Sequence, residues 1–324
     1  MRASSLRRGN IGVLLLAIAI ILVAFELATR LVIEHKSKVQ REVNVNYAEA
    51  IGIRRHRPPA PRQLLVIGNS LVGHGIDMDE LRRDLPTGWR AHDFWIYNTN
   101  YDDWYFGLRR LFADGSRPDV VAVVFAAMHW NATGIRGDYS AQYLFSTGDI
   151  PEVQSQLDLD KTTTVSLLFS RFSKAYAIRG EVRKVLLNQL LPDLPRMYGL
   201  FKPGPTRQFS ERQFVDVATR RMLAYKELAS RYGVALIVVV PPIPRPGEEH
   251  HAALRAAAAK AGVQIAIPLA GANVPPSDFS DDLHLTPQGA TLFTSALAQV
   301  LGPEMSVSVP DASRNLVSPA PGAN

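Results

Sequence analysis

The sequence has 324 residues, which is enough for one large or two small domains with a buried core. The formal net charge is +6, but much of the excess lies near the N-terminus. No zinc-finger, RNA-recognition or aromatic–basic pattern accompanies it, so nucleic acid is not an expected partner. Cysteine is absent, which excludes disulfides, a cysteine nucleophile and thiolate metal sites.

A long apolar segment follows three arginines at the N-terminus. Arg2, Arg7 and Arg8 precede an apolar run over residues 11–25, and after Glu26 the run continues to residue 33. Positive charge before such a run predicts a cytoplasmic N-terminus and export of the chain beyond the run. A cleaved signal peptide is the alternative, but no small-x-small cleavage site follows cleanly. We therefore expect an uncleaved single-pass anchor over residues 1–36 in the inner (cytoplasmic) membrane, with the domain on the periplasmic or extracellular side.

Three further segments are predicted from composition. Residues 37–61 are charged and then proline-rich, with a helical stretch near 39–51, and predict a spacer. The main domain is predicted over residues 62–301. The tail at residues 302–324 is rich in Pro, Ser and Ala and is expected to be disordered.

The first strand of the domain ends beside a serine. Residues 64–67 form a continuous apolar run, which is typical of a buried parallel strand, and Gly68 ends it. Asp77 predicts a helix N-cap, and Glu80 three residues later completes a capping-box pattern. Open α/β sheets bind ligands at the carboxyl ends of their strands. Ser70, just after this strand, is therefore the main candidate nucleophile.

A serine hydroxyl needs a base, and the base must be oriented by a third group. Asp281 and His284 lie three residues apart near the other end of the chain, so one loop can hold the carboxylate and the imidazole together. Asp282 is the alternative carboxylate to face His284.

Four more apolar runs alternate with helical segments, at residues 91–98, 119–126, 234–240 and 263–267. They predict a doubly wound, flavodoxin-like α/β fold with a five-stranded parallel sheet. Right-handed crossovers would bring the end of the first strand and the last loop to one edge, where Ser70 and His284 can meet.

A long stretch interrupts this alternation. Residues 137–231 predict a helical insertion beside the site, with one helix at 165–191 and another from about 211 to 231. Its basic side chains are typical of a solvated helix face, and contact with acidic glycans or phospholipid headgroups is the alternative.

These features resemble the SGNH/GDSL hydrolase family. Residues 68–70 (Gly-Asn-Ser) match its Gly-Asp-Ser block, with Asn in place of Asp, and residues 281–284 (Asp-Asp-Leu-His) match its Asp-x-x-His block. The resemblance covers about residues 63–301. It implies that Ser70 is the nucleophile, His284 the general base and Asp281 the residue that orients the imidazole. We expect Asn69 to stabilise the turn through bonds to backbone groups.

The family's middle blocks, which supply oxyanion donors, are altered. Asn100 takes the place of a glycine in the second block, and asparagine tolerates a positive φ better than most residues. In the third block, Ala126 and Met128 stand where the family has glycine and asparagine. Asn131 or His129 could reach the same space from the loop.

The resemblance implies acyl transfer from an ester, either to water as an esterase or to a sugar hydroxyl as an O-acyltransferase. The expected substrates are O-acetyl groups of cell-envelope or exported polysaccharide, with a membrane acyltransferase as a possible partner. No cofactor or metal is expected, because no nucleotide loop or ligand cluster occurs. The altered third block leaves an alternative: a catalytically idle domain that binds glycans or scaffolds an envelope polysaccharide-modification complex.

Overall fold

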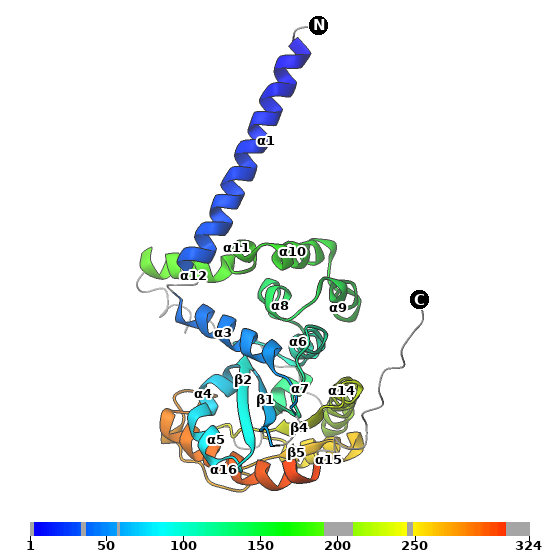
Figure 1. Ribbon diagram of the computed structural model, residues 1–324. Coiled ribbons are helices and arrows are strands. Elements are labelled where there is room, and N and C mark those ends of the chain that lie inside the picture. Colours follow the sequence, from blue (N-terminus) through cyan, green and yellow to red (C-terminus); the bar gives the residue numbers. More distant parts are fainter. Residues whose placement is uncertain (1–2, 34–36, 57–58, 191–209, 245–248, 309–324) are drawn as a thin grey trace.

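The computed structural model describes residues 3–33, 37–56, 59–190, 210–244 and 249–308 (Figure 1). Arg2, residues 191–209 of the expected insertion and the tail from residue 309 lie outside the described residues.

Five strands form one parallel sheet with the order β2-β1-β3-β4-β5 (Figure 1). The strand β1 lies between β2 and β3, and Gly68 at its end pairs with Trp95 on one side and Val124 on the other. The expected doubly wound α/β fold is confirmed. The strands are β1 (Arg62–Gly68), β2 (Trp89–Trp95), β3 (Val120–Val124), β4 (Ala235–Val239) and β5 (Gln264–Ala266).

Helices cover both faces of the sheet, because successive strand side chains point to opposite faces. In β1, Leu65 and Ile67 pack on one face, and Leu64 and Val66 pack on the other; all four are fully buried. The first face is covered by α3 (Lys38–Gly52), α6 (Tyr101–Ala113), α14 (Glu211–Arg231) and α15 (His251–Ala261). The second is covered by α4 (Ser70–Gly75), α5 (Met78–Asp84) and α16 (Pro287–Ser308).

The expected spacer at 37–61 is corrected by α3. Val43 and Ala50 of this helix are buried in the core that covers the first face of the sheet. The Ser37 hydroxyl caps the helix by accepting a hydrogen bond from the Gln40 N–H. Residues 38–52 therefore belong to the α/β unit, since their apolar side recurs at helical spacing and finds the sheet. At the other end, α16 continues to Ser308, beyond the expected end of the domain at residue 301 and into the tail that was expected to be disordered.

The expected capping box at α5 is only half formed. The Asp77 carboxylate accepts hydrogen bonds from the N–H groups of Asp79 and Glu80, as an N-cap should. However, the Asp77 N–H donates to Thr294 Oγ1, and the Glu80 carboxylate accepts from Ser295 Oγ. Both groups thus bind α16, which attaches the last helix of the chain to the helix after the first strand.

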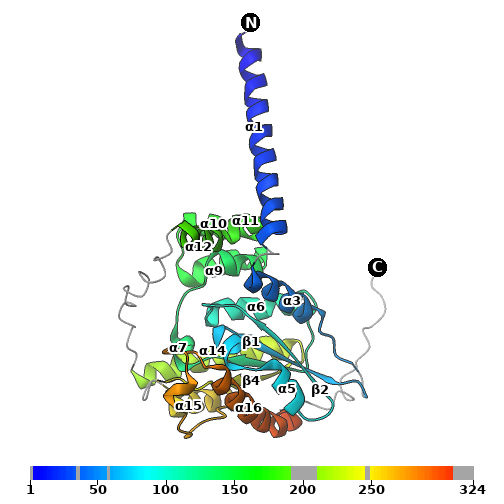
Figure 2. The same cartoon turned by 90° about the vertical axis from the view of Figure 1, so that its left-hand side faces the viewer.

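Residues 138–190 form a separate helical layer between α1 and the α/β unit (Figures 1 and 2). The single helix expected at 165–191 is interrupted, because Ser173 ends one helix and caps the next by accepting from the Tyr176 N–H. In addition, α14 packs on β4 and α15, so it is the crossover helix between β3 and β4 and no part of the insertion. The layer consists of α8 (Asp138–Tyr143), η2 (Thr147–Asp149), α9 (Ile150–Leu157), α10 (Lys161–Phe172), α11 (Lys174–Ala177) and α12 (Arg179–Leu190).

The N-terminal helix α1 (Ala3–Ala28) projects away from the rest of the molecule and continues into η1 (Thr29–Ile33) (Figures 1 and 2). Ile11–Leu31 is long and apolar enough to cross a membrane, and no residue from 11 to 28 is buried in the structure. Glu26 near its end accepts hydrogen bonds from Ser173 Oγ and from the N–H groups of Lys174 and Ala175. The foot of α1 is therefore bound to α11 of the insertion.

We predict that Gly68→Ala destabilises the protein, because an added Cβ would lie 2.6 Å from the Val124 carbonyl oxygen and 2.9 Å from Val72 Cγ2. Overpacking of this kind costs about 1–3 kcal/mol of the free energy of unfolding. The matched control is Gly52→Ala in α3, where nothing lies within 4 Å of an added Cβ. Denaturant unfolding in detergent should show a lower free energy for the first variant alone; equal values for both would contradict the prediction.

Candidate active site

Ser70 is the first residue of α4, directly after β1, and it is positioned by Asn69. The Asn69 side chain accepts a hydrogen bond from the Leu71 N–H at 3.0 Å and donates to the Thr99 carbonyl at 3.1 Å. Both partners are backbone groups, as expected from the sequence. Asn69 is also buried. Asn69 thus caps α4 and ties the serine turn to the loop after β2.

The loop before α16 presents His284 and Asp281 together. The Ser280 N–H donates to the His284 carbonyl at 2.8 Å, which closes a tight turn. Asp281 Oδ1 accepts the N–H groups of Leu283 and His284, while its Oδ2 lies 2.8 Å from His284 Nδ1. The carboxylate that faces the imidazole is therefore that of Asp281, and the alternative with Asp282 is excluded by this geometry.

The imidazole also meets the serine, since His284 Nε2 lies 2.8 Å from Ser70 Oγ although the two residues are 214 positions apart. Partial burial opposes ionisation of Asp281, but hydrogen bonds from the His284 ring and from two N–H groups lower its pKa overall. An ionised Asp281 makes Nδ1 the protonated nitrogen, so Nε2 is left to accept the Ser70 hydroxyl proton. Ser70, His284 and Asp281 are thus joined as a hydrogen-bonded chain.

A second histidine, which the sequence interpretation missed, lies beside this chain. The His74 ring is 5.0 Å from the His284 ring, edge to face, and its Nε2 lies 3.3 Å from the Tyr97 hydroxyl. Partial burial lowers the pKa of His74, and the neighbouring His284 lowers it further, although Asp281 acts in the opposite direction. His74 follows Ser70 by four residues, which is one helical turn, so the spacing itself was the available signal.

Asn100 was expected in the place of an oxyanion donor, but its N–H is bound to another residue. The Asn100 N–H donates to Asp103 Oδ2 at 2.8 Å, within the capping box of α6. Asn100 has a φ of −126°, and the positive φ expected there occurs at Asn98 (55°). The N–H that would take the place of the family's glycine donor is thus already bound.

His129 and Asn131 both lie on α7 (Ala127–Asn131), but only His129 is brought near the triad residues. Burial lowers the pKa of His129 to about 4. The neighbouring Ala126 carbonyl acts in the opposite direction and raises this pKa, and His284 is close enough to lower it further. The ring stacks on Phe125, and among the described residues its Nδ1 has no hydrogen-bond partner. Within the same described part of the chain, Asn131 Oδ1 is also buried without a partner, and no interaction joins Asn131 to Ser70 or His284.

A small apolar cluster adjoins the triad. Leu71, Ala126 and Ile243 are buried together, and Met128 and Leu283 pack against them. Leu71 follows Ser70, Leu283 precedes His284, and the others follow β3 or β4. The cluster therefore forms an apolar wall at the carboxyl edge of the sheet.

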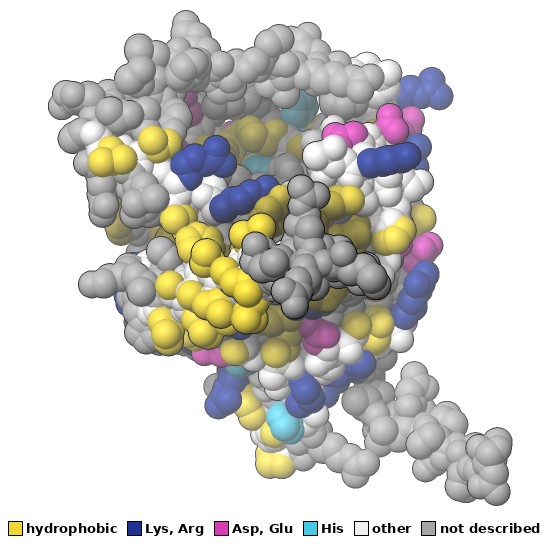
Figure 3. Space-filling model, turned by 90° about the horizontal axis from the view of Figure 1, so that it is seen from above, with side chains coloured by type: hydrophobic (Ala, Val, Ile, Leu, Met, Phe, Trp, Pro, Cys, Tyr) yellow, Lys and Arg dark blue, Asp and Glu magenta, His cyan; other side chains and the backbone are white. Residues whose placement is uncertain are grey.

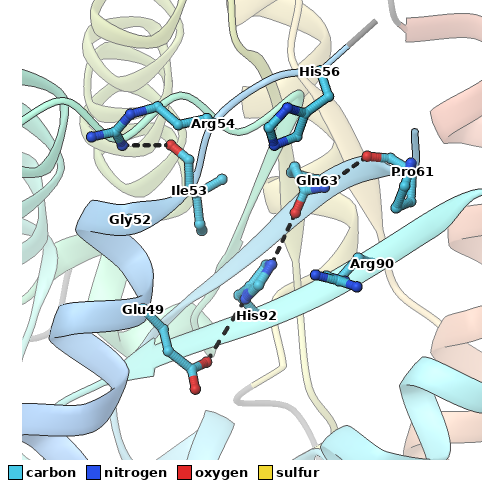
Figure 4. Close-up of a pocket in the computed structure, with 9 residues that line it drawn as sticks. All are labelled: Glu49, Gly52, Ile53, Arg54, His56, Pro61, Gln63, Arg90 and His92. Atoms are coloured by element: carbon cyan, nitrogen blue, oxygen red, sulfur yellow. Dashed lines mark hydrogen bonds and ion pairs between the residues drawn. The ribbon is translucent and has the colours of Figure 1, made fainter. Parts of the chain in front are cut away.

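Two of the cavities in the described part of the chain lie near the sheet, and neither is lined by Ser70, His284 or Asp281. One of about 300 Å³ is at the amino ends of β1 and β2, where His92 binds Gln63 and faces Glu49 (Figure 4). This edge is opposite the one that carries Ser70, so the cavity is separate from the candidate site. The other, of about 220 Å³, lies beyond β4 and β5 and shares Ile243 with the apolar cluster. Among the described residues, no group of three or more His, Asp or Glu could hold a metal ion.

Comparisons with known proteins add solved structures of low similarity. The sequence matches no protein-family model and no curated protein. A GDSL-like lipase from Bacteroides thetaiotaomicron is 12% identical, with 82% of this chain and 98% of that chain covered and a TM-score of 0.42. A carbohydrate esterase family 2 enzyme from Corynascus thermopiles (Myceliophthora fergusii) is 11% identical, with 78% and 69% covered and a TM-score of 0.42. An acetylxylan esterase from Geobacillus stearothermophilus is 11% identical, with 78% of this chain and 98% of that chain covered and a TM-score of 0.37.

Three features of the chain itself define the site. The parallel sheet has the order β2-β1-β3-β4-β5, a serine follows β1, and an Asp-x-x-His segment precedes the last helix. The histidine of that segment meets the serine at hydrogen-bond distance. The sheet therefore carries both end blocks at its carboxyl edge, which is the arrangement that the resemblance in sequence predicts.

Proposed function

We propose that this protein is a serine esterase or O-acyltransferase that acts on acyl esters. The observation that supports this most directly is the chain of two 2.8 Å hydrogen bonds from Ser70 Oγ through His284 to Asp281. A serine, an imidazole and a carboxylate in this order are the groups that nucleophilic acyl transfer requires.

In the proposed reaction, Ser70 Oγ attacks the ester carbonyl while His284 Nε2 takes the hydroxyl proton. The imidazolium that forms is stabilised by the ionised Asp281 through Nδ1. His284 then gives the proton to the leaving alcohol, and an acyl-Ser70 ester remains. Water or a sugar hydroxyl next loses a proton to His284 and attacks this ester, which releases the acyl group and restores Ser70. The side chains present supply every proton transfer.

Oxyanion stabilisation must use donors other than the family's middle blocks. The Ser70 N–H stands at the first position of α4, where a helix has no acceptor of its own. We propose that the neutral imidazole of His129 is the second donor, because it is buried, lies near His284 and has an unpartnered Nδ1 among the described residues. Asn131 remains the weaker candidate. Asn100 could contribute through its N–H only after release from Asp103.

The surroundings of the triad suit a small acyl group on a polar alcohol. The apolar cluster around Leu71 and Leu283 offers a few side chains, enough for a short acyl chain such as acetyl. Beside His284, the rings of His74 and Tyr97 offer partly exposed aromatic surface next to polar groups, which suits a sugar ring. We therefore propose O-acetyl groups of cell-envelope or exported polysaccharide as substrates.

We further propose that α1 is a retained single-pass anchor in the inner membrane, with the domain on its outer side. Basic residues precede the apolar helix, as in segments whose C-terminal side is exported. A cleaved signal sequence can have the same length and apolar composition. Retention is favoured because Glu26 makes three hydrogen bonds to the insertion, which cleavage after α1 would remove. Transfer to a glycan would also require an acyl supplier, for which a membrane acyltransferase is the fitting partner.

A catalytically idle domain that binds glycans or scaffolds an envelope complex is the second candidate. Two observations favour it over catalysis: the Asn100 N–H is bound to Asp103, and Met128 stands where the family has an asparagine donor. Loss of one oxyanion donor costs roughly 10²–10³ in kcat.

We predict that Ser70→Ala, His284→Ala and the double variant all lose activity to nearly the same residual level. Both side chains serve one chemical step, so their effects should not add, and the loss should be on the order of 10³–10⁶. The measurements are turnover of an activated acetyl ester and labelling by a fluorophosphonate probe. Wild-type turnover or labelling in the Ser70→Ala protein would reject Ser70 as the nucleophile, whereas a wild-type protein that processes no acyl ester would favour the glycan-binding scaffold.

A pair of neighbouring carboxylates gives a matched test of the third member. Asp281→Asn should lower kcat clearly, though less than loss of Ser70, because it removes the charge that supports the imidazolium. Asp282→Asn should leave kcat within about two-fold, since Asp281 and not Asp282 binds His284. Equal losses for the two variants, or a larger loss for Asp282, would show that the carboxylate was misassigned.

We expect His129 to make stability depend on pH. Its pKa is lowered to about 4 in the folded protein, whereas the unfolded chain takes up the proton below about 6.5. Its contribution is thus intact above that value and is lost as pH falls toward 4, by about 3 kcal/mol of the free energy of unfolding. Denaturant unfolding between pH 7 and 4 should show a shallower loss for His129→Phe than for wild type; parallel curves would contradict the buried, neutral state.

A further inference from the structure

The helix α10 presents its apolar side to the exterior. Val165, Phe169 and Phe172 recur at spacings of four and three residues, so they share one face, and they are 48%, 60% and 72% exposed. On its other sides, α10 buries Leu167 in the core, and the hydroxyls of Ser166 and Ser170 both donate to Asp138 Oδ1 at 2.7 Å. The helix is therefore apolar on two sides, whereas a surface helix of a water-soluble domain has a polar outer side. The exposed face of these three residues is called the α10 stripe.

The α10 stripe lies at the foot of the candidate membrane span. Ser173, the residue after Phe172, donates to Glu26 of α1 at 2.8 Å. Glu26 precedes Leu31, the last residue of the span, by five positions, so it lies about 7 Å inside the end of the span at about 1.5 Å per residue. From this point α10 and α11 extend to one side of α1, roughly across its axis (Figure 1). Phe172 and the rest of the stripe are therefore near the depth at which the span leaves the bilayer.

The segment 161–190, which contains α10, is mainly basic, whereas the preceding part of the layer is acidic. Between residues 161 and 190 the sequence has one acidic side chain, Glu181, which is paired with Arg136 at 2.7 Å. Seen from the side of α1, hydrophobic side chains, including those of α1 itself, and several Lys and Arg side chains lie on this face (Figure 3). Aromatic residues flanked by cations are typical of helices that lie in the interface of anionic membranes. Of the basic residues in this segment, Lys174 is buried and Arg179 pairs with Asp138 at 2.6 Å. The others are Lys161, Arg171, Arg183 and Lys184.

We propose that the α10 stripe is embedded in the interfacial region of an anionic lipid bilayer, so that the insertion lies flat on the membrane that α1 spans. An interfacial helix buries its apolar face about 5–10 Å deep, which agrees with the level of Glu26. The inference rests on the anchor proposed above but not on the acyl-transfer chemistry. One consequence concerns the substrate: the insertion layer separates the sheet and α4 from the foot of α1 (Figures 1 and 2). Ser70 is then held away from the bilayer, where a polymer reaches it more readily than a lipid of the same membrane.

The absence of cysteine allows a direct test with single-cysteine variants of the full chain. Phe169→Cys and Phe172→Cys report the α10 stripe, and each is labelled with an environment-sensitive fluorophore. Ile18→Cys is the control within the span, and Leu292→Cys is the matched exposed apolar position on α16, 43% exposed. The proteins are placed in nanodiscs of phosphatidylcholine with phosphatidylglycerol. We expect labels at 169 and 172 to be quenched several-fold less by aqueous iodide than the label at 292, and to be quenched by brominated lipid as at 18.

The outcomes separate the proposals. If iodide quenches the labels at 169 and 172 as strongly as the label at 292, while the label at 18 is in lipid, the interfacial position is wrong and the anchor stands. Aqueous exposure at 18 as well would reject the anchor, and this inference with it, whereas fluorophosphonate labelling of Ser70 reports on the chemistry independently. Nanodiscs of phosphatidylcholine alone should give weaker shielding, and equal shielding would overturn the preference for anionic lipid. Combining Val165→Cys with Phe169→Ser and Phe172→Ser should restore iodide quenching at 165; continued shielding would show that the two rings do not carry the insertion.

Discussion

The hydrogen bond between Ser70 Oγ and His284 Nε2 depends on the packing of one loop against α16. The His284 loop is closed by an antiparallel bridge between Phe279 and Leu285, and the Thr286 N–H donates to the Asp278 carbonyl. The same carbonyl lies so close to Gly289 that a side chain there would collide with it. The glycine lets α16 start directly against the loop, and α16 packs on α4, which carries Ser70. The geometry of the triad is therefore set by helix packing as much as by its own members.

The oxyanion side of the site differs more from the family pattern than the nucleophile side does. Asp103, fully buried, accepts hydrogen bonds from the Asn100 N–H, the Arg136 N–H and Ser140 Oγ. It therefore connects the loop after β2 to the start of the insertion. A carboxylate with three donors has a structural role that a glycine turn does not need. Buried His129 lies near His284 on this side of the site, and its low pKa keeps the ring neutral over the physiological range.

The insertion connects the candidate anchor to the α/β unit through buried polar contacts. Gln40 of α3 exchanges hydrogen bonds with the hydroxyls of Tyr139 and Tyr143 of α8, and Arg110 of α6 donates to two carbonyls near the end of α8. Glu26 completes the connection from α1 to α11. Buried polar groups are costly unless each is paired, so such contacts favour one arrangement of the layers. The orientation of α1 relative to the sheet is thereby specified.

The sequence by itself determined the sheet, the serine turn and the Asp-x-x-His loop, because buried strands, N-caps and tight turns depend on near neighbours in the chain. It also predicted the backbone bonds of Asn69. Tertiary structure alone decided that Asp281 rather than Asp282 meets His284, that His74 adjoins them, and that Asn100 binds Asp103. Likewise, the expected spacer became α3 because its apolar side finds the sheet, whereas α10 buries Leu167 and leaves Phe169 and Phe172 exposed. Contacts between segments distant in sequence leave no local pattern, so only the folded chain fixes them.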